Sequence, residues 1–116
     1  MSYYDELPVY KASYDLLLAI FRFTKDFARE YKYTVGEKLK NTTIEMVVLI
    51  YRANSRNDKA VVLQEAREQI ETIRLLIRLM KDLQQISMKK FVNINKQIEN
   101  VSKQITGWQK KQCISE

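Results

Sequence analysis

The stretch "KFVNINKQIENVSKQITGWQKK", residues 90–111, decides the fold, because it carries two separate patterns along one segment. Its apolar residues recur at alternating spacings of three and four, which places them on one face of an α-helix. These residues are Phe91, Ile94, Ile98, Val101, Ile105 and Trp108. The apolar pattern predicts a helix that packs nearly parallel to its neighbours at a shallow crossing angle.

The remaining sequence predicts three further helices joined by short polar turns. Pro8 suits the first position of a helix, where its missing N–H costs nothing. Thr34 and Glu37 have the spacing of a capping box at the start of a second helix, and Ser87 can cap the last one. We expect helices over about residues 8–30, 35–54, 58–84 and 88–111, followed by a short C-terminal tail.

The connections between these helices are only a few residues long, so neighbouring helices must run antiparallel. A chain of 116 residues with two glycines and one proline is suited to one domain of long helices. We therefore expect an all-α fold, an up-down-up-down antiparallel four-helix bundle, as a single domain over residues 1–116.

Several classes of protein chemistry have no support in the composition. The chain has no histidine, which is the commonest general base and metal ligand, and a single cysteine, Cys113. Two scattered glycines cannot form a phosphate-binding loop. We expect no enzyme activity, no catalytic residues, no metal and no cofactor. The enzyme hypothesis that remains is catalysis by Tyr and Arg residues in a pocket between helices.

The location predicted from the sequence is cytoplasmic. The apolar runs are far shorter than a membrane span. Asp5 and Glu6 stand where a signal peptide would carry basic residues. We expect no membrane partner.

Positive charge gathers in the last quarter of the chain. The net charge is +6, and residues 85–116 hold six lysines against two glutamates, which gives +4. Such an excess favours a polyanionic or acidic partner.

Two sets of basic residues could meet such a partner. In the last helix, lysines seven residues apart lie on nearly the same face and extend along about 30 Å. We call the row Lys89, Lys96, Lys103 and Lys110 the lysine stripe. Lys111 continues a neighbouring row, and only Glu99 adds negative charge to this helix. The stripe is either a contact for phosphates or an ordinary solvated surface.

The second basic set lies on one side of the third helix. It consists of Arg67, Arg74, Arg78 and Lys81. Arg74 and Arg78 are four residues apart and repel each other, so something must offset their charges. Acidic residues on a neighbouring helix or subunit could do so, or a bound anion.

Five segments together resemble a known family. They are "LPVY", "YTVGEKLKN", "ANSRNDK", "LQEAREQIETIRLLIRLMKDLQQIS" and "GWQKK". In order and spacing they resemble the accessory variability determinant (Avd) proteins of diversity-generating retroelements. These belong to a four-helix-bundle group that includes 23S rRNA intervening-sequence proteins. The latter typically carry a Ser-Ile-Pro-Ser-Asn-type stretch in the second helix. This chain has "TTIEMVVLIYRANS" there, which places it nearer the retroelement group.

The resemblance, which covers about residues 7–111, implies a barrel-like homopentamer with a basic surface. It also implies binding to the reverse transcriptase of the element and to its template RNA or cDNA, in support of mutagenic retrohoming. Carried over by position, the nucleic-acid-binding residues are Arg67, Arg74, Arg78, Lys81, Lys89, Lys96, Lys103, Lys110 and Lys111. The alternative is a scaffold of the intervening-sequence type that binds proteins and no nucleic acid.

Overall fold

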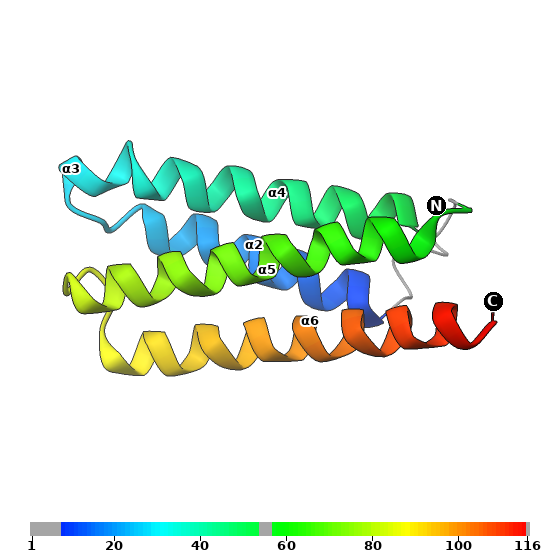
Figure 1. Cartoon of the computed structure of the whole chain (residues 1–116). Helices are drawn as coiled ribbons and strands as arrows, with labels where there is room; N and C mark the ends of the chain where they lie inside the picture. The colour runs from blue at the N-terminus through cyan, green and yellow to red at the C-terminus, as the bar shows by residue number, and fades with distance from the viewer. Residues whose placement is uncertain (1–7, 54–56, 116) are drawn as a thin grey trace.

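The computed structural model describes residues 8–53 and 57–115, with side chains described as far as Lys111. Its helices are α2 (Pro8–Thr24), α3 (Arg29–Lys32), α4 (Val35–Ala53), α5 (Lys59–Asp82) and α6 (Met88–Ser115). In the described part of the chain, the four long helices run alternately up and down, and the short α3 sits at the turn between α2 and α4 (Figure 1). The predicted all-α four-helix bundle is confirmed.

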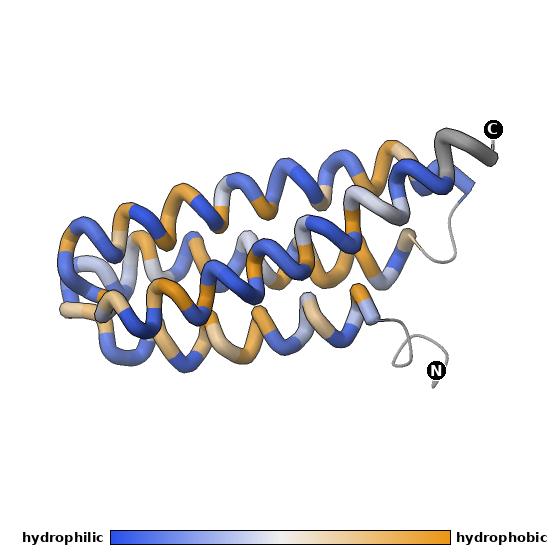
Figure 2. The backbone as a smooth tube through the Cα atoms, turned by 90° about the horizontal axis from the view of Figure 1, so that it is seen from below, coloured by the Kyte–Doolittle hydropathy of each residue, from blue (hydrophilic) through white to orange (hydrophobic). Residues whose placement is uncertain are grey.

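The core lies along the axis of the bundle. Each long helix packs against two neighbours, in the cyclic order α2, α4, α5, α6. Figure 2 shows hydrophobic segments recurring along every long helix between hydrophilic ones. The apolar face predicted for residues 90–111 is buried: Ile94, Ile98, Val101 and Ile105 are 0% exposed. Phe91 and Trp108, at its two ends, are partly buried against the same core.

The predicted first helix, 8–30, was wrong at its end. Helix α2 stops at Thr24, and α3 is a separate turn of helix. The chain leaves the helix so that Phe27, which is 4% exposed, can pack into the end of the core. The Ala28 N–H then donates to Gln85 Oε1 across the bundle (2.7 Å). No proline or glycine lies between Thr24 and Ala28, so no helix-breaking residue ends α2. The helix ends instead because two tertiary contacts, the burial of Phe27 and the Ala28–Gln85 hydrogen bond, require a different backbone path.

Two predictions about the other helix ends differ from the structure, and one is confirmed. The capping box does not form, because the Thr34 hydroxyl donates back to the Glu30 carbonyl (2.8 Å) and Glu37 pairs with Lys40 (2.7 Å). The tail predicted after residue 111 is helical to Ser115, since no proline or glycine follows Gly107 to stop α6. Ser87 does cap α6, as its hydroxyl accepts from the Lys90 N–H (3.2 Å).

The turn between α5 and α6 contains a residue in the left-handed backbone region. Gln84 has φ 63°, and it is the one non-glycine residue with positive φ in the described segments. Its N–H donates to the Lys81 carbonyl (3.0 Å), and the Gln85 N–H donates to the Met80 carbonyl (2.8 Å). This pair of bonds is the Schellman motif that ends many helices, with glycine as the usual residue at this position.

Replacing Gln84 with Gly is therefore expected to stabilise the protein by about 0.5–1 kcal/mol. Glycine relieves the strain that a side chain causes in the left-handed region. Part of that gain is lost, because glycine has more conformational freedom in the unfolded chain. Thermal unfolding followed by circular dichroism measures it as a melting temperature a few degrees higher. Gln84→Ala is the control, because alanine keeps the Cβ that causes the strain. A glycine variant no more stable than the alanine variant would contradict the prediction.

Candidate functional site

The lysine stripe lies on the side of α6 away from the core. Lys89, Lys96, Lys103 and Lys110 are all exposed. Within residues 8–53 and 57–115, none of the four has an ion-pair partner. Other lysines of the chain do have such partners, for example Lys11, whose ammonium lies 3.1 Å from the Asp15 carboxylate. The stripe therefore presents four uncompensated charges to solvent.

A groove runs along α6 beside the stripe. It encloses about 510 Å³. The groove is lined by Val92, Asn95, Lys96, Glu99, Asn100 and Lys103. Its two lysine ammonium groups and two asparagine amides are donors that suit phosphate oxygens. Chemically, these donors can hold a backbone phosphate.

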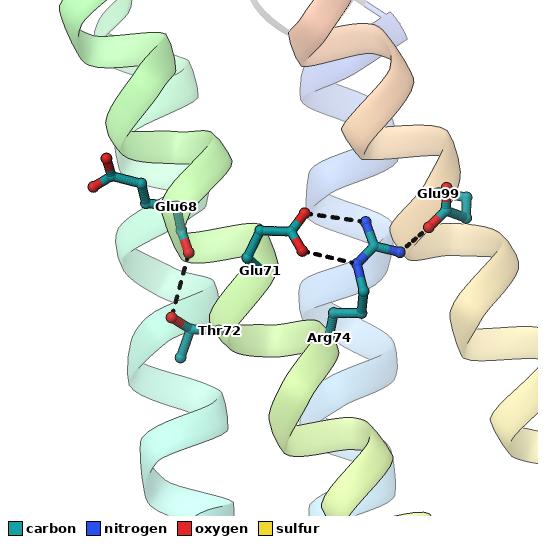
Figure 3. Close-up of polar contacts among 5 residues, drawn as sticks. All are labelled: Glu68, Glu71, Thr72, Arg74 and Glu99. Atoms are coloured by element: carbon teal, nitrogen blue, oxygen red, sulfur yellow. Dashed lines mark hydrogen bonds and ion pairs between the residues drawn. The ribbon is translucent and has the colours of Figure 1, made fainter.

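The arginines of α5 have acidic partners within the chain. Figure 3 shows Arg74 lying between Glu71 of the same helix and Glu99 of α6. Its Nε donates to Glu71 Oε1 (3.3 Å), and its Nη1 donates to Glu99. Arg78 Nε donates to Asp82 (3.2 Å). The charges that would repel each other are thus offset by acids on α5 itself and on the neighbouring helix.

The other two predicted residues of α5 also reach toward α6. Arg67 Nη1 donates to Gln109 Oε1 (2.9 Å). The Lys81 ammonium lies 5.3 Å from the centre of the Phe91 ring and 3.6 Å from Asp82. Together with Arg74 they line the seam between the two helices. The structure therefore places Arg67, Arg74 and Lys81 beside α6. The stripe lies on the outer face of α6, and Lys111 is exposed near its end.

The sequence reasoning missed a second basic cluster at the other side of the bundle. A hollow of about 430 Å³ is lined by Leu18, Phe21, Arg22, Thr24, Lys25, Lys32 and Lys40. Six of the residues from 22 to 40 are Arg or Lys, and this density is the signal that could have pointed to the region. These residues line one hollow because the chain turns between α2 and α4. The prediction of one helix over 8–30 did not include that turn, so the cluster was not predicted.

Among the residues whose side chains are described, no group of three or more His, Cys, Asp or Glu is placed to hold a metal ion. Within the same part of the chain, no helix combines the length and apolar character needed to cross a bilayer.

A family model described as bAvd-like matches residues 9–112, which is nearly the whole chain. The comparison with curated proteins finds no match.

Proposed function

The chain belongs to the bAvd-like family, and we propose that it is a non-catalytic accessory protein of a diversity-generating retroelement. In this proposal one domain assembles into a homo-oligomer, a barrel-like pentamer in the Avd pattern, in the cytoplasm. Its basic surfaces bind the RNA or DNA of the element and its reverse transcriptase, and so support mutagenic retrohoming.

The observation that carries the proposal is the uncompensated lysine stripe. Residues seven apart on a helix are separated by about 10.5 Å, which matches roughly three base pairs of a duplex. Exposed lysines at this interval can contact about every third phosphate along one strand. Such contacts position a nucleic acid without reading its sequence. An ordinary solvated face would be expected to mix charges, as the Lys11–Asp15 and Arg78–Asp82 pairs do elsewhere in this chain.

The basic residues at the α5–α6 seam form the flank of the proposed interface. The Arg78 side chain is 66% exposed and bonds to Asp82 through Nε, which leaves its terminal N–H groups available to a ligand. Arg67, Arg74, Lys81 and Lys111 are proposed as the remaining flanking contacts. Arginine suits this role because its planar guanidinium can hold a carboxylate and a phosphate at once.

The test is a titration of the purified protein against a labelled structured RNA at 50 and 200 mM salt. Four phosphate contacts would make the logarithm of the binding constant fall with a slope of about three to four against the logarithm of salt. That corresponds to a loss of affinity of roughly 100-fold between the two conditions. Affinity that stays constant between them would reject the nucleic-acid proposal.

The alternative function is a scaffold that binds proteins only. It is favoured by one observation, an exposed apolar row at the end of α5 formed by Leu75 at 66%, Leu79 at 39% and Leu83 at 39%. Exposed apolar side chains of this size are typical of protein contacts. Absence of RNA binding, together with retention of a reverse transcriptase in a pull-down, would support this alternative.

Removing the negative charge of Glu99 should have the opposite effect on RNA affinity to removing a lysine from the same surface. It lies between Lys96 and Lys103 on α6 and repels an approaching phosphate. Glu99→Gln is expected to increase RNA affinity severalfold at low salt. Its cost in stability should be below about 1 kcal/mol, since the pair with Arg74 is half exposed and Arg74 keeps Glu71. Fluorescence anisotropy measures the affinity, and Glu45→Gln, an exposed acid on α4, is the control. Equal gains in both variants would indicate a general charge effect and contradict a local interface.

A further inference from the structure

The hollow between α2, α3 and α4 is a second basic site, on the opposite side of the bundle from the α5–α6 seam. Its four cations come from three helices and the turn between them: Arg22 in α2, Lys25 after it, Lys32 in α3 and Lys40 in α4. Its volume of about 430 Å³ is in the range of sites for small molecules, about 300–1,000 Å³.

The charges around the hollow are not balanced within the chain. Its lining contains no acidic residue. Lys40 pairs with Glu37 at 2.7 Å, while Arg22, Lys25 and Lys32 have no ion-pair partner in the described segments. Cations gathered round one hollow repel each other, and a bound anion removes that repulsion. A phosphate, with several acceptor oxygens, suits a guanidinium and ammonium groups whose side chains line one hollow.

An aromatic ring lies beside these cations. Phe21 is 41% exposed, and the Lys40 ammonium lies 5.5 Å from the centre of its ring. The Lys40 side chain is only 26% exposed, so the ring and the Glu37 carboxylate hold it in place. Leu18 extends the apolar surface of the hollow. A flat aromatic base can pack on Phe21 while the phosphate attached to its sugar meets the cations.

We propose that this hollow binds a nucleoside phosphate, with the phosphate held by Arg22, Lys25 and Lys32 and the base packed on Phe21. A free nucleotide and one unit of a single strand share this chemistry. The site uses other helices than the lysine stripe, so it stands whether or not the stripe binds RNA.

The experiment titrates the full chain, labelled with nitrogen-15, with four probes and follows the backbone amide signals. The probes are adenosine 5′-monophosphate, adenosine, inorganic phosphate, and the dinucleotide ApA, whose only phosphate is an internal diester. Adenosine monophosphate is expected to shift amides between residues 18 and 40 and to bind about tenfold more tightly than adenosine or phosphate alone. Inorganic phosphate binding as tightly as the nucleotide, or no shifts between residues 18 and 40, would overturn the proposal.

The dinucleotide identifies the source of the ligand. Binding of ApA at these amides would support recognition of a unit within a strand. Binding of the monophosphate without ApA would support recognition of a free nucleotide or a strand end.

Paired variants separate this site from general charge. Arg22→Gln with Lys25→Gln is expected to weaken adenosine monophosphate binding about tenfold, since both side chains are exposed and their loss leaves the core intact. Lys96→Gln with Lys103→Gln removes the same charge from α6 and should leave that binding within about twofold. Equal weakening by the two pairs would overturn the proposal. RNA binding measured on the same variants reports on the stripe separately, so failure of one site is distinguishable from failure of the other.

Discussion

The variant in which all four lysines of the stripe are glutamine is expected to bind structured RNA at least about 100-fold more weakly than the wild type at 50 mM salt. The slope of affinity against salt should also fall by about three to four, because each of the four lost lysine–phosphate contacts removes about 0.7–0.9 of a unit. Stability should change little, since Lys89, Lys96, Lys103 and Lys110 are exposed and glutamine favours helix as lysine does. Anisotropy titrations at several salt concentrations measure both quantities.

A second variant with the same net charge is the control for this result. It replaces four basic residues on the other helices with glutamine: Lys11, Arg29, Lys38 and Lys59. If long-range attraction by the positive protein explained binding, both variants would weaken it equally. We expect the control to retain most of the affinity and most of the salt slope, and equal losses would contradict a localised interface.

The largest expected effect on stability comes from the centre of α5. Ile73 is 0% exposed, and Ile73→Ala should cost about 2–5 kcal/mol, from lost apolar burial and from the cavity that remains. This is a large fraction of the roughly 5–15 kcal/mol that stabilises a typical domain. Urea unfolding followed by circular dichroism measures it as a lower midpoint with an unchanged slope.

Leu75, two residues along the same helix, is the matched control. It is 66% exposed, so Leu75→Ala should change stability by less than about 0.5 kcal/mol. A cost as large as that of Ile73→Ala would contradict the exposure of Leu75 in solution and would indicate that another subunit or partner covers it. Repeating the unfolding at several protein concentrations would reveal such an association.

Much of the fold could be predicted because helix periodicity is a local property of the chain. The spacing of Ile94, Ile98, Val101 and Ile105 identified the buried face of α6 without reference to any other helix. Ser87 was recognised as a cap because its partner, the Lys90 N–H, is three residues away. The positions of the stripe lysines on one face follow from the same geometry.

The end of the first helix and the surroundings of Arg74 could not be predicted, because the deciding contacts join distant residues. The break after Thr24 depends on Phe27 entering the core and on the bond from Ala28 to Gln85, which lies 57 residues along the chain. The offset of Arg74 by Glu99 spans 25 residues and requires α5 and α6 to be rotated toward each other. The basic residues of the candidate site were therefore predicted, but the partners that surround each of them in the structure were not.

The sequence by itself determined the helical class, the buried faces and the excess of positive charge on α6. Each of these depends on residues within about two helical turns of one another, so the local sequence determines it without reference to the other helices. The tertiary structure decided how the basic side chains are arranged relative to acidic partners and to one another. Packing brought Glu99 to Arg74, left the stripe without ion-pair partners in the described residues, and gathered Arg22, Lys25, Lys32 and Lys40 around one hollow. The physical reason is that the Arg74–Glu99 pair and the hollow depend on side chains from different helices, whose relative rotation only the packed core fixes.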